Sequence, residues 1–120
     1  MPKGSHLGDL EELLLLAVRR LGGDAHGGRI REELASLAGR TVSISTVYVT
    51  LMRLEEKGYA RSWKGEPSTE RGGKAKRHYE VRPEGLQVLK DVRDVRERMW
   101  QDAGLGEAPV GEAPVGEANV

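Results

Sequence analysis

The stretch that decides the fold reads Ser43-Ile-Ser-Thr-Val-Tyr-Val-Thr-Leu-Met-Arg-Leu-Glu-Glu-Lys-Gly58. It begins with a hydroxyl side chain that suits a helix N-cap, and it ends with a glycine that suits a left-handed C-cap. Val47, Leu51 and Leu54 follow one another at spacings of four and three residues, which places them on one helix face. The stretch therefore predicts an amphipathic helix that buries one side.

The opposite face of this helix is suited to a flat polar surface. A DNA groove is such a surface, and short or cationic side chains allow a helix to approach it closely. Tyr48 has two interpretations, as a hydroxyl donor to a phosphate or as a half-buried core tyrosine. We expect DNA contacts from the cap, this face and the tyrosine, namely Ser43, Ser45, Thr46, Tyr48, Val49 and Arg53.

The residues that follow predict a β-hairpin. Tyr59-Ala-Arg-Ser-Trp63 has the aromatic enrichment of a strand, and Lys76-Arg-His-Tyr-Glu-Val81 reads as a returning strand. Between them, residues 64–75 are rich in Gly, Pro and Ser. The order helix, strand, basic loop, strand is that of a winged helix-turn-helix, with the loop as its wing.

The net charge of zero hides a segregation of charge. Residues 59–82 hold 7 Lys and Arg against 3 Asp and Glu, whereas residues 83–120 hold 4 against 8. A cationic loop is either a solvated loop without a partner or, beside a helix-turn-helix, a contact to the phosphate backbone. We expect such wing contacts from Lys64, Arg71, Lys74, Lys76 and Arg77.

Two further helices precede the decisive one. Residues 9–21 predict a first helix, whose run Leu13-Leu-Leu-Leu16 makes the apolar stripe wider than a one-sided surface helix needs. Either this helix is deeply buried in the core, or it is shared between the core and a partner subunit, which Leu15 and Leu16 would contact. Residues 28–38 predict the second helix, with Ile30, Leu34, Leu37 and Ala38 facing inward.

A long helix is predicted over residues 83–103, beginning at Pro83. Apolar residues recur along it at spacings of four, three and four, as in a heptad seam. Either the helix packs within the protomer, or it pairs with its copy in a homodimer, which the small size of the core favours. The interface residues would be Val88, Val92, Val95 and Met99, with Trp100 beside them.

The predicted fold is mainly α with a small β-hairpin, a winged helix-turn-helix followed by a long C-terminal dimerisation helix. Residues 1–82 would form the DNA-binding domain and residues 83–103 the dimerisation helix. Residues 104–120 repeat Gly-Glu-Ala-Pro-Val with a degenerate last copy. This composition predicts a flexible tail.

Other classes of protein fit the sequence poorly. The three histidines lack metal-ligand spacing, no serine lies in a nucleophile-elbow pattern, and no glycine-rich turn continues as a phosphate-binding loop. We therefore expect that the protein is not an enzyme and that it binds no metal and no cofactor. The chain has no cysteine, no signal-peptide-like start and no apolar run of about 18 residues, so we expect a cytoplasmic protein without membrane contact.

The chain resembles the PadR family of bacterial transcriptional regulators over about two thirds of its length. The most specific match is Val-Tyr-x-x-Leu-x-x-Leu-Glu-x-x-Gly with a Gly-Gly wing motif before a tyrosine. The matching segments are Leu7-Gly-Asp-Leu10, Ala25-His-Gly-Gly28 with Ile30, Ser45-Thr-Val-Tyr48, Leu51, Leu54, Glu55, Lys57-Gly58, Gly72-Gly73, Lys76-Arg-His-Tyr79 and Pro83-Glu-Gly85. Arg82 departs from the family, which usually has threonine there.

The resemblance implies a winged-helix homodimer that represses a promoter by binding an inverted-repeat operator in double-stranded DNA. It also implies an effector, because some small members look to bind flat aromatic compounds near a tryptophan of the last helix. Trp100 is the matching residue here, although an interface tryptophan also packs well without a ligand. The alternative is a winged helix that binds another protein and not DNA.

Overall fold

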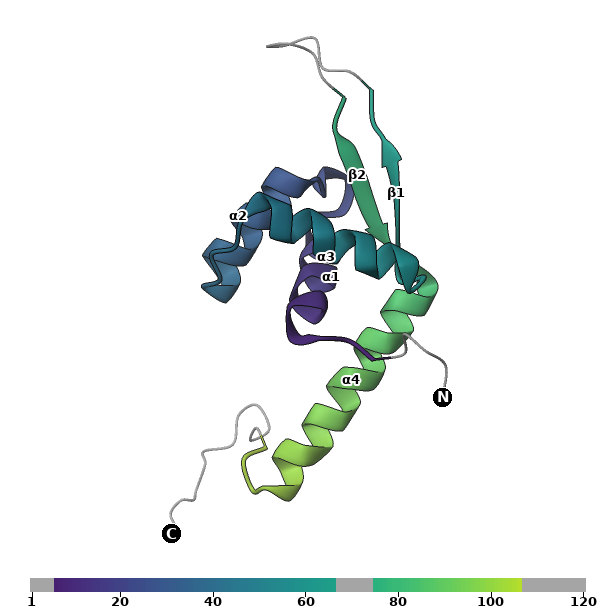
Figure 1. Cartoon of the computed structure of the whole chain (residues 1–120). Helices are drawn as coiled ribbons and strands as arrows, with labels where there is room; N and C mark the ends of the chain where they lie inside the picture. The colour runs from purple at the N-terminus through teal and green to yellow at the C-terminus, as the bar shows by residue number, and fades with distance from the viewer. Residues whose placement is uncertain (1–5, 67–74, 107–120) are drawn as a thin grey trace. The chain divides into compact units, whose positions relative to one another are not determined.

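The computed structural model describes residues 6–66 and 75–106 (Figure 1). The chain is mainly helical, with a two-stranded antiparallel hairpin and a long C-terminal helix, as its sequence predicts. It divides into two compact units, Met1–Leu89 and Lys90–Val120. The elements are α1 (Asp9–Leu21), a short 3-10 turn η1 (Gly22–Asp24), α2 (Gly27–Ala38), α3 (Ile44–Glu56), β1 (Ala60–Lys64), β2 (Arg77–Val81) and α4 (Pro83–Asp102).

The core of the first unit is built around α1, which packs against α2, α3 and β2. Leu14 and Leu15 are fully buried, whereas Leu16 is 42% exposed. Of the two interpretations of this helix, the deeply buried one therefore applies to Leu15. The assignment of Leu15 to a subunit interface is not supported, because its side chain leaves no surface for a partner.

α2 and α3 form the helix-turn-helix. Ile30 and Leu34 of α2 are buried, as predicted. The prediction that Leu37 and Ala38 also face inward is wrong, because both are exposed and Leu37 is 60% exposed. Neighbouring helices cover only the side of Ile30 and Leu34, and the last turn of α2 is left open to solvent.

Local signals define both ends of α3. The Ser43 hydroxyl accepts a hydrogen bond from the backbone N–H of Thr46 at 3.1 Å, which confirms the predicted N-cap. At the other end, Gly58 has φ +82° and donates to the carbonyl of Glu55, while Tyr59 donates to that of Leu54. These two bonds are the pair of a Schellman motif, which requires a left-handed residue at the position of Gly58.

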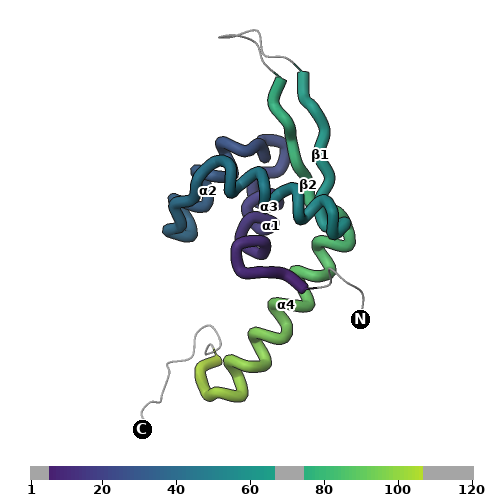
Figure 2. The backbone as a smooth tube through the Cα atoms, viewed as in Figure 1, coloured from purple at the N-terminus to yellow at the C-terminus, as the bar shows by residue number. Residues whose placement is uncertain are grey.

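The hairpin is fixed to the helices by a third short segment. β1 and β2 pair in register from Ala60 opposite Val81 to Lys64 opposite Arg77. On the outer side of β2, His26 bridges to His78, and the backbone N–H of Tyr79 donates to the carbonyl of Ala25 at 2.9 Å. The residues just before α2 therefore extend the sheet, and the wing is joined to the helix-turn-helix (Figure 2).

The start of α4 packs against the start of β1. A Cβ on Gly85 would lie only 2.3 Å from the carbonyl oxygen of Tyr59, so the close approach requires glycine. The same carbonyl accepts from the N–H of Arg82 at 2.9 Å. The helix begins at Pro83, as predicted, although Arg82 before it carries no capping hydroxyl.

The remainder of α4 belongs to the second unit. Val95, Met99 and Trp100 are exposed there, and Met99 is 66% exposed. Val88, by contrast, is buried within the first unit, so its burial does not support its assignment to a subunit interface. Within residues 6–66 and 75–106, none of the helices is both long and apolar enough to cross a membrane.

Candidate nucleic-acid interface

The exposed face of α3 is the first part of the candidate surface. Val49 lies at its centre, because residues three and four positions away on a helix are its neighbours. These neighbours are all exposed, and they are Ser45, Thr46, Met52 and Arg53. Four of the predicted contact residues therefore share one open face, and Met52 joins them. Sequence reasoning missed Met52, although its position three residues after Val49 indicates the same face.

The hydroxyl groups at the start of α3 bind one another. The Ser43 hydroxyl donates to the Thr46 hydroxyl at 2.9 Å and lies 3.2 Å from the Ser45 hydroxyl. The same Ser43 oxygen caps the helix. Much of the hydrogen-bonding capacity of these three side chains is therefore used within the protein.

Tyr48 connects α3 to the start of α2 and to the wing. Its hydroxyl group lies so close to Gly27 that a Cβ there would be 2.4 Å from the phenolic oxygen. The Tyr48 side chain nonetheless remains exposed. It lines an open groove together with His26, Gly28, Ala75, Lys76, Arg77 and Tyr79. The Tyr48 ring therefore packs on the start of α2 and borders a cationic groove, and its role as a hydroxyl donor to a phosphate stays a prediction.

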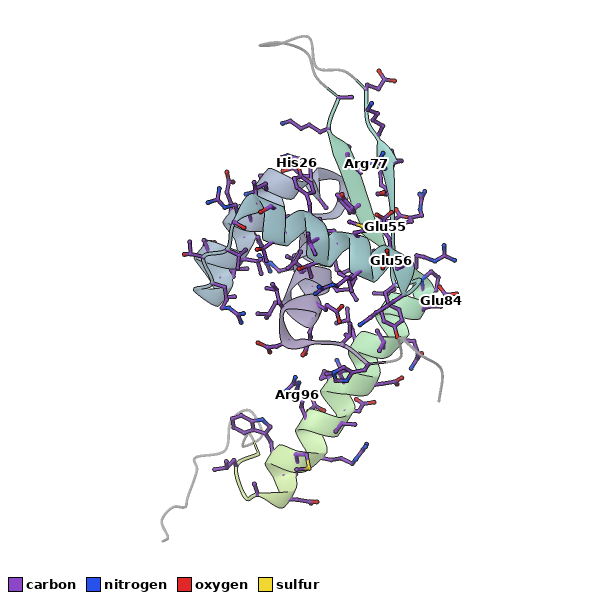
Figure 3. All side chains as sticks on the ribbon, in the orientation of Figure 1. His26, Glu55, Glu56, Arg77, Glu84 and Arg96 are labelled. Carbon is purple, nitrogen blue, oxygen red and sulfur yellow. The ribbon has the colours of Figure 1, made fainter. Side chains whose placement is uncertain are left out.

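A chain of hydrogen bonds connects the base of the wing to α3. Arg77 donates to the Ser62 hydroxyl at 2.9 Å, and that hydroxyl donates to the Glu55 carboxylate at 2.6 Å. Arg77 and Glu55, at the two ends of this chain of bonds, are labelled in Figure 3. Lys64 lies opposite Arg77 in the register, so both side chains share the hairpin face that carries Ser62. This face is turned toward α3, and it carries two of the predicted wing contacts.

The other face of the hairpin is covered by stacked rings. The Trp63 and His78 rings stack with centroids 5.9 Å apart, and His26 meets His78 edge-on at 6.0 Å. Arg61 lies over Trp63 at 4.8 Å and pairs with Glu80 across the strands at 2.6 Å. The charge of Arg61 is therefore neutralised, which leaves other cations to contact phosphates.

The groove owes its positive charge to lysine and arginine and not to histidine. Burial lowers the pKa of His26, and the charge of Lys76 lowers it further, whereas Asp24 acts in the opposite direction. His26 is thus largely neutral at neutral pH. Lys64, Lys76 and Arg77 are exposed at the wing, while the predicted contacts Arg71 and Lys74 lie outside the described residues.

Comparisons with known proteins agree with this geometry. A family model described as the transcriptional regulator PadR-like family matches residues 14–91. The chain belongs to the PadR-like family of transcriptional regulators. The matched residues include α2, α3, the hairpin and the start of α4. Family membership also places the chain among regulators and not among enzymes.

Solved structures share the fold. A PadR family transcriptional regulator from Eggerthella lenta is 27% identical, with a TM-score of 0.63, and 79% of this chain aligns with 78% of that chain. A PadR-like transcription factor from Bacteroides fragilis is 21% identical, with a TM-score of 0.67 and coverages of 79% and 86%. A transcriptional regulator from Clostridium thermocellum is also 21% identical, with a TM-score of 0.63 and the same coverages. A search of curated proteins gave no match.

An ion pair anchors the end of α3 to the start of α1. The Glu11 carboxylate accepts from Lys57 at 2.7 Å and from the backbone N–H of Gly8 at 2.7 Å. Burial raises the pKa of Glu11, but the hydrogen bonds and the charge of Lys57 more than offset this, so the pKa is lowered overall. The ionised form of Glu11 therefore stabilises the fold that presents α3.

Glu11→Gln should lower the free energy of unfolding of this PadR-like protein at neutral pH by about 1.5–3 kcal/mol, the range for hydrogen bonds to a charged group. A lowered folded-state pKa means that the stabilisation is complete above the ordinary value of 4.5 and is lost as the pH falls through the folded value. Urea unfolding of both proteins at several pH values measures this. Glu56→Gln, at an exposed position, is the control. An equal deficit at neutral pH and in strong acid would contradict the account.

Proposed function

We propose that this PadR-like regulator binds double-stranded DNA with the exposed face of α3 and the cations of the β1–β2 hairpin. It acts as a homodimer on an inverted-repeat operator and represses transcription until a small aromatic effector releases it. The observation that carries the proposal is the continuity of the surface. The open face of α3 leads past Tyr48 into a groove that Lys76 and Arg77 line.

The chemistry of the side chains indicates which of them contact bases and which contact phosphates. A recognition helix reads base edges, mainly with its N-terminal residues, and the phosphate contacts set affinity and register. Ser45, Thr46 and Val49 lie in the first half of α3, where base contacts are expected. Lys64, Lys76 and Arg77 would contact the backbone instead. Winged helices that bind proteins are the alternative, and they would show no saturable binding to a duplex.

The first test is a titration into a labelled duplex from upstream of the gene, beside a scrambled duplex, at two salt concentrations. The proposal expects saturable, salt-sensitive binding that is tighter for the native duplex. Equal binding to both duplexes would indicate phosphate contacts alone and an operator elsewhere. No binding to either duplex at low salt would support the protein-binding alternative.

Replacing Thr46 and Arg53 together with alanine should weaken binding to the operator by about tenfold or more, because each good base contact contributes about 1–3 kcal/mol. Both side chains are exposed, so the fold should be unaffected. Fluorescence anisotropy measures the change, and Arg19→Ala, at an exposed position of α1, is the control. Unaltered operator affinity in the double variant would exclude α3 as the recognition helix.

Lys76→Ala should reduce the dependence of affinity on salt for any duplex. Each lost phosphate contact lowers the slope of log K against log salt by about 0.9. The operator and the scrambled duplex should lose affinity to a similar degree, which separates this residue from those that read bases. A slope equal to that of the unchanged protein would remove Lys76 from the phosphate contacts.

The dimer is proposed from the exposed apolar residues of α4. Val95 and Met99 lie on one helix face with half-buried Val92, and a partner helix would cover them. Trp100 is 58% exposed beside this face, so it is available to a planar effector. Leu16 of α1 remains a proposed interface residue because it is also exposed.

Met99→Asp should shift the protein from dimer to monomer, since it places a charge on a face that would be desolvated. Lys90→Asp is the matched control, because at 3.6 residues per turn it lies on the opposite side of the helix. Sedimentation equilibrium of the full chain distinguishes the states. An unchanged mass for Met99→Asp, with dimer present in both proteins, would place the interface elsewhere.

A further inference from the structure

We infer that Val49 is a specificity-determining residue that reads the 5-methyl group of thymine in the major groove. The inference rests on the proposed DNA-binding function and adds the chemistry of the base that is recognised. Val49 is 44% exposed at the centre of the open face of α3, and its neighbour Met52 is 52% exposed. The middle of the recognition surface is therefore apolar.

The composition of α3 leaves few other means of reading bases. Between Ser43 and Glu56 there is no asparagine, glutamine, lysine or histidine, so the residues that pair with adenine are absent. Arg53 supplies the helix with its one fork of donors for guanine or a phosphate. Glu55 accepts from Ser62 and so is directed toward the wing.

The hydroxyl groups beside Val49 are also committed in part. The Ser43 hydroxyl lies 3.2 Å from that of Ser45 and 2.9 Å from that of Thr46. The same hydroxyl also caps the helix. Turning the Ser43 hydroxyl to a base would leave the backbone N–H of Thr46 without its capping partner. The Val49 side chain forms no hydrogen bond that a base would have to replace, and its contact with a base requires no rearrangement of the helix.

The shape of valine suits a methyl group. A β-branched side chain in a helix holds essentially one χ1 rotamer, so the two methyl groups of Val49 are fixed in direction. Of the major-groove edges, only thymine presents an apolar group. The adjacent Met52 is flexible and can cover whatever apolar surface the valine leaves. The geometry thus favours a half-site with a thymine at the position that faces Val49.

The test begins by selecting the operator from random duplexes with the full-length protein. Each thymine is then replaced in turn by deoxyuridine, which keeps base pairing and lacks only the methyl group. We expect one or two positions in each half-site where the replacement weakens binding about three- to fivefold, the size expected for one buried methyl group. In Val49→Ala, the same replacement should cost nothing.

Two controls keep the outcomes distinct. Val49→Thr preserves the shape of the side chain and exchanges one methyl group for a hydroxyl, so it should reduce the methyl effect without unfolding the helix. Circular dichroism confirms folding of each variant. Sequence-selective binding with no deoxyuridine effect, or with the same effect in Val49→Ala, would overturn the inference while the proposed function stands. Absence of selective duplex binding would overturn both.

Discussion

The burial of one stripe of α3 is the constraint on which the rest of this structure depends. Val47, Leu51 and Leu54 are fully buried, and they hold the helix against α1 and α2. Because no described element covers the opposite side of the helix, Val49 and its neighbours face solvent. The Ser43 cap and the glycine at 58 fix where the helix begins and ends, and the pair of Glu11 with Lys57 fixes its C-terminal end on α1.

The wing depends on the same scaffold through polar contacts. The backbone bond from Tyr79 to Ala25 joins β2 to the segment before α2, and the Ser62 hydroxyl joins β1 to Glu55 of α3. The hairpin therefore has two attachments to the helix-turn-helix. A cation such as Arg77 is presented at a set position relative to α3, which is what simultaneous contact with a groove and its flanking phosphates requires.

The sequence predicted those features that are encoded locally. The bounds of α1, the cap at Ser43 and the glycine that ends α3 all follow from the residue types at single positions. The sequence could not show that Leu15 is buried and Leu16 exposed, because four consecutive leucines do not indicate which side of the helix its neighbours cover. Leu37 was misplaced for a related reason: periodicity gives a direction on the helix but not whether another element lies there.

Contacts between segments distant in the sequence were not predictable. The bridge of His26 to His78 and the link from Arg77 through Ser62 to Glu55 depend on how the hairpin is positioned, which no local pattern encodes. For the candidate site, the residues of α3 were found because amphipathicity identifies the exposed face as well as the buried one. Met52 was missed, although its spacing from Val49 places it on this face, because the prediction selected short and cationic side chains.

The most direct measurement is hydroxyl-radical footprinting of the protein with and without its operator duplex. Met52 and Met99 are both exposed and both react readily, but Met52 lies on α3 and Met99 lies on α4. The account predicts that DNA protects Met52 and Tyr48 from oxidation while the reactivity of Met99 is unchanged. Protection of Met99 by DNA with Met52 unaffected would contradict it, because the nucleic acid would then bind a surface other than the open face of α3.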